Sequence, residues 1–299
     1  QLTTFHEDMH DEAFTYTRQT LGYPAPEFRV ARDQSAPTMG AHPGDAEVAG
    51  GTITLGSRQD GVFIFDNEKW AHEVAVEPFQ IAKAPVTNSE FLAFVDDGGY
   101  RDERFWDSKG WAWRESEDAE CPVYWRRGED GGCWTRAFDT DVPLPPNQPV
   151  SHVNWHEAAA WCRWAGRRLP SEIEWETAAS YGPEAGELLF EAPKSRYPWG
   201  EAIGCSIPAN LDGSHTGLVD VAAYPDGDSA FGCRQMIGNI WEWTASDFVP
   251  FPGFSVDPYD DYSKPWFGTR KVLRGGAWAT RGRMISNTYR NFFTPDRRD

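Results

Sequence analysis

The contrast between the start of the chain and the rest of it constrains the fold most. Residues 5–20 contain neither Gly nor Pro, and this run ends at Gly22 with Pro24 just beyond, a pattern typical of a helix C-terminus. One isolated helix cannot bury its own apolar face. We therefore expect a single helix over residues 1–27 that either packs on the large domain or belongs to a longer protein.

The remaining sequence predicts a linker and one large domain. Residues 28–48 are rich in Ala, Pro and Gly without periodicity, so we expect an extended linker there. From residue 49 to residue 299 short alternating runs separated by turns predict strands. Residues 181–299 hold many Gly and Pro residues and predict long ordered loops. Together with a few helices, this pattern predicts an α+β fold.

Capping signals locate the helices inside the large domain. Thr87 with Glu90, and Ser171 with Glu174, each form the Ser/Thr-x-x-Glu pattern of a capping box. His156–Trp164 is a further helical stretch. Helices are therefore predicted at these two boxes and at this stretch.

Composition limits the class of partner. The formal net charge of −18 argues against nucleic acid or an anionic membrane surface as the main partner. No apolar run approaches the length of a membrane span. The five cysteines lie outside any Cys-x-x-Cys pair, which favours a reduced, cytoplasmic setting. Fifteen tryptophans are more than a core of this size needs and favour aromatic-walled pockets for small molecules.

A histidine pair on the first helix is the first candidate for chemistry. His6 and His10 are four residues apart, so both imidazoles can reach one divalent metal ion from one helix face. The same residues, with Glu7, spell the zincin motif, in which Glu7 would act as general base on a zinc-bound water. The metzincin extension fails at Ala13 and Tyr16. A zinc hydrolase therefore stays open as the weaker alternative.

Four segments of the large domain together resemble the formylglycine-generating-enzyme (sulfatase-modifying factor) domain. They are Pro149–Trp155, Gly166–Glu176, Gly238–Thr244 and Val272–Trp278. The resemblance implies a C-type-lectin-like α+β domain with little regular structure. Joined to an upstream His-x-x-x-His-x-Glu helix, the set resembles the ergothioneine-pathway sulfoxide synthases, also called hercynine oxygenases, including the related selenoneine synthases.

This resemblance implies a reaction and a cofactor. The family uses non-haem Fe(2+) and O₂ to form a C–S or C–Se bond at the imidazole C2 of hercynine (Nα-trimethylhistidine). The substrates would be hercynine, a thiol or selenol donor, and O₂. Residues 1–27 would then be the last helix of a DinB-type bundle that binds iron through three histidines. The third histidine is expected upstream of this chain, in a protein of about 400 residues or more.

The resemblance also implies site residues in the C-terminal third of the chain. The family carries a catalytic tyrosine and a pocket tyrosine three residues apart, and Tyr259 and Tyr262 match that spacing. A tyrosine hydroxyl can deliver a proton to a reacting oxygen species. The simpler alternative is that this Pro- and Asp-rich segment is a surface turn.

Substrate-binding residues are implied at two places. Asn291 matches the asparagine that helps to hold hercynine, and Met9 stands where some members have Gln between the two histidines. Members that use γ-glutamylcysteine have Trp and Asp after this asparagine, where this chain has Phe292 and Phe293. Loss of that carboxylate favours another donor, such as cysteine or a selenium compound.

Two rival functions share the large domain. Formylglycine-generating oxidases need a cysteine pair in the C-terminal part of this domain, but the sequence has no cysteine after Cys233, so we reject that activity. A non-catalytic lectin-like binding module stays open, because a fold does not dictate a function.

Overall fold

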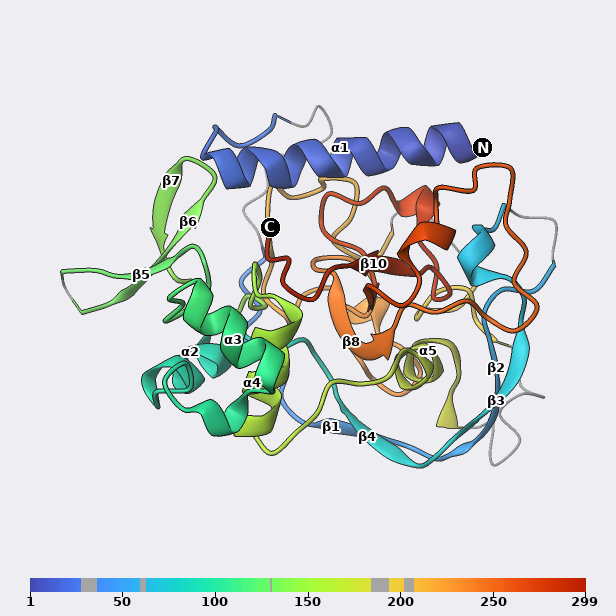
Figure 1. Ribbon diagram of the computed structural model, residues 1–299, viewed down its shortest axis with the longest axis horizontal. Coiled ribbons are helices and arrows are strands. Elements are labelled where there is room, and N and C mark those ends of the chain that lie inside the picture. The colour runs from blue at the N-terminus through green and yellow to red at the C-terminus, as the bar shows by residue number, and fades with distance from the viewer. Residues whose placement is uncertain (28–36, 60–62, 130, 184–193, 202–206) are drawn as a thin grey trace.

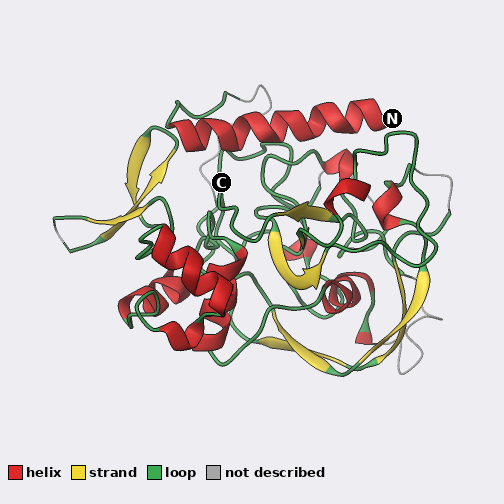
Figure 2. Ribbon diagram, in the orientation of Figure 1, coloured by secondary structure: helices red, strands yellow, loops and turns green. Residues whose placement is uncertain are grey.

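The computed structural model describes residues 1–27, 37–59, 63–129, 131–183, 194–201 and 207–299. Helices and short strands alternate with long loops, so the fold is α+β as predicted (Figure 2). One long helix lies along a side of the molecule, at the top of Figure 1, and the other elements lie beneath it. No helix in the described ranges is long and apolar enough to cross a bilayer.

The N-terminal helix α1 covers Leu2–Leu21, so it ends at the stop signal at Gly22 and not at residue 27, the predicted end of the helical segment. Gly22 adopts a left-handed conformation (φ 65°), which closes the last turn without steric cost to a side chain. The buried residues of α1 are the polar Asp8, Thr15 and Gln19. Polar contacts with the large domain therefore position this helix as much as apolar burial does.

Helices α2 (Asn88–Asp96) and α5 (Glu172–Ser180) begin at the two predicted capping boxes. Helix α4 (Trp155–Trp164) begins one residue earlier than its predicted stretch, after a third box made by Asn154. Helix α3 (Ser108–Ser116) was not predicted. Its Gly110 lowers helix propensity, but a Cβ there would lie 3.1 Å from His156, so the glycine permits close packing against α4.

In the described ranges the strands form four small antiparallel sheets. Two sheets have two strands each, β1 with β4 and β2 with β3. The other two have three strands each, in the orders β5–β6–β7 and β10–β9–β8. Their bounds are Asp45–Val48 (β1), Gly51–Leu55 (β2), His72–Val76 (β3), Phe79–Ala82 (β4), Trp125–Arg127 (β5), Cys133–Ala137 (β6), Thr140–Pro143 (β7), Glu242–Asp247 (β8), Lys271–Arg274 (β9) and Asn291–Phe293 (β10).

Strand β1 corrects the predicted linker. It lies inside residues 28–48, yet it pairs with β4, and its Ala46 and Val48 are buried. A four-residue strand is too short to show a reliable alternation, and its pairing partner is distant in sequence. Of the remaining linker residues, 28–36 lie outside the described ranges.

Three hydrophobic clusters among the described residues support the fold, and two of them bear on the placement of α1 and the larger helices. One is rich in aromatic residues and lies between α2 and α4. The other contains Phe65, Trp175 and Tyr289, and Phe5 and Met9 of α1 pack against it. Because the loop residue Tyr262 packs on this second core too, the core brings α1 and the C-terminal loops together.

Candidate functional site

The two histidines of α1 lie side by side. Their ring centroids are 4.5 Å apart, and the ring planes are inclined by 51°. The His10 side chain is 51% exposed, whereas His6 is partly buried. Within the described residues no group of three or more His, Cys, Asp or Glu side chains is arranged to hold a metal ion. The pair can therefore offer two imidazole ligands and leaves further positions open.

The predicted tyrosine segment reaches this pair. The ring of Tyr259 lies 5.8 Å from the ring of His6, and Tyr259 is 40% exposed. Tyr262 turns inward and stacks on Phe65 at 4.9 Å, with its hydroxyl 3.5 Å from that of Tyr289. Burial, and then the adjacent Tyr289, raise the pKa of Tyr262 well above its usual value. Tyr262 therefore stays protonated, and Tyr259 is the tyrosine that lies beside the histidines.

Strand β10 carries Asn291, Phe292 and Phe293, and they divide between two surroundings, whereas the predicted Met9 lies on α1 and packs against the core that contains Phe65. Phe292 stacks on Phe248 at 4.0 Å and lies 6.0 Å from Tyr262, edge to face. The Asn291 side chain accepts a hydrogen bond from the backbone N–H of Phe292 at 2.9 Å. Phe293 lies under the Arg297 guanidinium at 4.0 Å. Strand β10 thus brings Phe292 close to Tyr262 and gives Phe293 a cationic neighbour.

A large cavity of about 1000 Å³ borders the later turns of α1. Among its lining residues are Glu12, Tyr16, Trp241, Trp278, Phe293 and Arg297. Neither histidine of the pair lines it, nor does Tyr259 or Tyr262. Of the predicted site residues only Phe293 faces this space, so the structure separates Phe293 from the His6–Tyr259 contact.

Glu12 is a site residue that the sequence analysis did not single out. Its two carboxylate oxygens accept hydrogen bonds from Trp241 Nε1 at 2.5 Å and from Thr280 Oγ1 at 2.7 Å. Burial in this interface raises the pKa of Glu12, which the two hydrogen bonds partly offset. The His-x-x-x-His-x-Glu pattern contains Glu12, so the sequence did carry a signal for this residue. Helix geometry places Glu12 on a different helix face from the two histidines, which separates its role from theirs.

The same buried face of α1 makes further polar contacts. Asp8 accepts two hydrogen bonds from Arg283, at 2.7 and 2.9 Å. Gln19 donates to the Arg136 carbonyl and accepts from the backbone N–H of Phe138. Each of these side chains fixes the rotation of α1 on the large domain, and therefore the direction in which His6 and His10 point.

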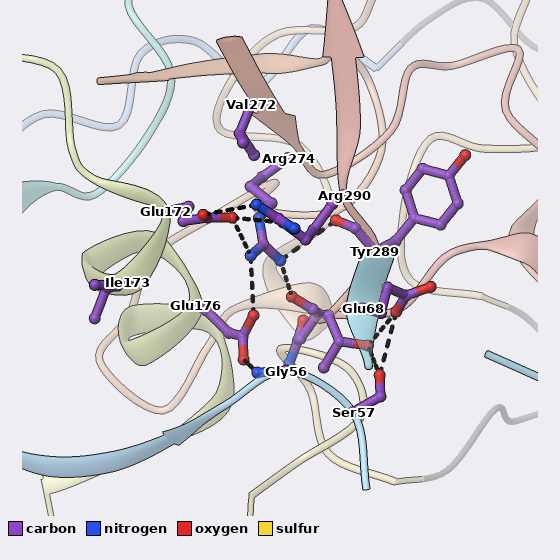
Figure 3. Close-up of polar contacts among 12 residues, drawn as sticks. Gly56, Ser57, Glu68, Glu172, Ile173, Glu176, Val272, Arg274, Tyr289 and Arg290 are labelled. Carbon is purple, nitrogen blue, oxygen red and sulfur yellow. Dashed lines mark hydrogen bonds and ion pairs between the residues drawn. The ribbon is translucent and has the colours of Figure 1, made fainter. Parts of the chain in front are cut away.

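A buried cluster of charged side chains lies next to the start of strand β10. Figure 3 shows Glu172 facing both Arg274 and Arg290, with Glu176 beside Arg274. Both guanidinium groups are fully buried, and Glu176 also pairs with Lys194. Because Arg290 directly precedes Asn291, this cluster sets where β10 begins. No local pattern in the sequence indicated it.

Comparison with known proteins assigns the family. Residues 31–299 match the sulfatase-modifying factor enzyme 1-like domain. A hercynine oxygenase from Mycolicibacterium thermoresistibile is 41% identical over 99% of this chain and 66% of its own length. One from Mycolicibacterium smegmatis is 38% identical over 99% of this chain and 68% of its own length. The chain belongs to the hercynine oxygenase family.

This assignment confirms the resemblance that the four segments and the histidine helix predicted. The chain spans about two thirds of the length of the two hercynine oxygenases. The fold is also similar to the structure of PvdO from Pseudomonas aeruginosa, with a TM-score of 0.53, 20% identity, and coverage of 88% of this chain and 95% of that one. At that identity the similarity supports the fold alone.

Proposed function

We propose that this chain belongs to an oxygenase of the ergothioneine pathway. The reaction is O₂-dependent formation of a C–S or C–Se bond at the imidazole C2 of hercynine, at a non-haem iron(II) centre in the cytoplasm. The approach of Tyr259 to the His6–His10 pair carries this proposal. It joins a metal-ligand pair and a proton donor from opposite ends of a chain whose relatives are hercynine oxygenases.

The histidine pair fits iron(II) by its chemistry. Imidazole nitrogens are good ligands for first-row divalent metals, and their partial exposure leaves room for substrates and for ligands from elsewhere in the protein. Under this proposal α1 is the C-terminal helix of a DinB-type bundle. Iron(II) bound here would supply the activation of O₂.

Tyr259 and Tyr262 take different roles. Tyr259 is exposed and next to His6, so its hydroxyl can deliver a proton to a group bound beside the histidines. Tyr262 is held protonated with its hydroxyl toward Tyr289, and we assign it to the hercynine-binding wall beside the histidines, outside the cavity of about 1000 Å³. The segment that carries both residues is thus a catalytic loop in this proposal.

Aromatic rings beneath α1 provide a wall for the trimethylammonium group of hercynine. Phe65 contacts Tyr262 and Tyr289, with ring centroids at 4.9 and 5.4 Å, and Trp241 contacts Tyr289 at 5.7 Å. A ring face that a ligand can reach attracts a quaternary ammonium through cation–π interactions, and Trp241 and Tyr262 are the members of this set that are only partly buried. Asn291, the first residue of β10, can orient the imidazole ring of hercynine by hydrogen bonding.

The chalcogen donor is proposed to be something other than γ-glutamylcysteine. At Phe293 the side chain offers no carboxylate, and Arg297 covers its ring. The carboxylate that the resemblance places here in members that use γ-glutamylcysteine is thus missing from this chain. Cysteine or a selenosugar is therefore the preferred class of donor.

Metal analysis of purified His6→Ala and His10→Ala variants tests this function. We expect stoichiometric iron in the unaltered protein and loss of iron and product formation together in each variant, since each removes one ligand. Glu7→Gln is the matched control, because Glu7 is 72% exposed and has no role in the proposed reaction. An active His10→Ala protein with full iron content would contradict the proposal.

The alternatives give different results in the same assay. Zinc, with a hydrolysis that Glu7→Gln abolishes, would favour the zinc hydrolase. A protein without a transition metal and without turnover would favour the binding module.

A further inference from the structure

One short segment, Phe65–Lys69, contacts α1, both ends of the stretch that carries Tyr259 and Tyr262, and the residues just before β10. It contains the 3₁₀ turn η1 (Asp66–Glu68). Its first four residues are almost fully buried, with exposed fractions of 3, 2, 1 and 4%. Three consecutive buried polar side chains are costly unless each has a hydrogen-bonding partner. Their partners therefore show what the segment does.

The first set of partners lies on both sides of Tyr259 and Tyr262. We call residues 257–263 the tyrosine loop. At its end, Ser263 Oγ donates to Asp66 Oδ1 at 2.5 Å and accepts from Asn67 Nδ2 at 3.1 Å. At its start, Asp257 receives Lys69 Nζ at 2.7 and 2.8 Å. The loop is thus held at both ends by the same short segment.

The second set of partners lies on α1 and beside β10. The Phe65 ring lies 5.8 Å from that of Phe5 on α1. Arg290, which precedes β10, donates to the Asn67 carbonyl at 2.8 Å. Glu68 accepts from Thr288 Oγ1 at 2.6 Å. A single rigid turn therefore relates the tyrosine loop to the histidine helix and to β10.

We propose that Ser263, Asp66 and Asn67 are positioning residues that hold Tyr259 against His6 and keep the hydroxyl of Tyr262 turned inward. The side chains of Asp66 and Asn67 both hydrogen-bond to the fully buried Ser263, and this residue anchors the end of the tyrosine loop. A misplacement of about 1 Å can cost on the order of 10²-fold in rate, so a loop that carries a proton donor needs such fixation. The catalytic consequence rests on the proposed function, whereas the placement itself does not.

Chemical nitration of metal-free protein measures the placement directly. Tetranitromethane reacts with accessible phenolate, so in the unaltered protein Tyr259 is modified while Tyr262, with its raised pKa, is protected. In Ser263→Ala we expect the ratio of Tyr262 to Tyr259 nitration, read by peptide mass spectrometry, to rise about tenfold as the loop opens locally. In turnover, product formed per O₂ consumed should fall about tenfold.

Three further variants separate positioning from general damage. Asp66→Asn keeps an acceptor for Ser263 and should give the unaltered nitration pattern, whereas Asp66→Ala should reproduce Ser263→Ala. Ser229→Ala removes another buried serine hydroxyl, which accepts from Cys233 N at 3.3 Å and touches neither segment. It should lose some stability with the nitration ratio unchanged.

Lys69 is partly exposed, so replacing it tests the positioning of the tyrosine loop without disturbing the hydrophobic core. Lys69→Ala releases only the Asp257 end of the loop, and we expect lower coupling of O₂ to product. Unchanged nitration and coupling in both Ser263→Ala and Lys69→Ala would overturn the inference. If the unaltered protein forms no C–S or C–Se bond, the proposed function fails, and the nitration ratio still decides the positioning role.

Discussion

Replacing Glu172 by Ala should be among the most damaging single changes in this protein. Glu172 is the shared partner of two fully buried guanidinium groups, at 3.1 Å from Arg274 and at 2.9 and 3.0 Å from Arg290. The remaining hydrogen bonds of Arg290 go to the uncharged carbonyls of Asn67 and Val249. Without Glu172, Arg290 therefore keeps a buried charge with no adjacent carboxylate in direct contact.

The size of the effect follows from burial. Removing one partner of a buried ion pair typically costs about 3–5 kcal/mol of unfolding free energy, because the other charge stays desolvated. The pair of Arg168 with Glu174 is the matched control, since the Arg168 side chain is 66% exposed. Arg168→Ala should cost about 0–1 kcal/mol, as is usual for surface pairs. Glu172→Gln, which keeps the shape of the side chain, should fall between the two.

Urea unfolding followed by tryptophan fluorescence measures these differences. We expect Glu172→Ala to lower the midpoint strongly without changing the slope of the transition. Adding Arg290→Met to Glu172→Ala removes the orphaned charge and should recover part of the lost stability. A Glu172→Ala protein as stable as Arg168→Ala would refute the argument from buried charge.

Three other outcomes are expected. Tyr259→Phe should keep the affinity for hercynine but lower bond formation by about 10²-fold while O₂ is still consumed, and normal turnover in it would mean that Tyr259 is not the proton donor. Mass spectrometry of products from competing γ-glutamylcysteine, cysteine and selenosugar should show γ-glutamylcysteine disfavoured in kcat/KM; a preference for it would contradict our interpretation of Phe293. Burial raises the pKa of Glu242 from 4.5 to about 8, so the folded state binds more protons between these values and stability falls as pH rises through that window. Urea unfolding across this pH range should show a flatter fall for Glu242→Gln, and an unchanged slope would argue against the raised pKa.

Local signals in the sequence located much of the framework. The end of α1 at Gly22 and the starts of α2 and α5 follow from capping chemistry, which involves residues within one turn of each other. The four matched segments indicated the family for the same reason, since each is contiguous. His6 could likewise be named from its spacing to His10, whereas Tyr259 was named from the resemblance to the family, and the roles of both stay predictions.

Long-range contacts could not be read in this way. Helix α3 contains a glycine that opposes a helix locally and permits its packing on α4, and β1 is defined by its pairing with β4. The buried turn Asp66–Glu68 reads as an ordinary polar loop in the sequence, and its partners Ser263, Thr288 and Arg290 come from the far end of the chain.

The residue types and spacings of the chain thus determined its class, its first helix and its candidate chemical groups. The distance between Tyr259 and His6, the rotation of α1 through Glu12, and the burial of Glu172 between two arginines came from tertiary packing alone. The physical reason is that helix periodicity and capping act over a few residues. A buried charge or hydroxyl, in contrast, is stabilised only by partners that the folded chain brings to it.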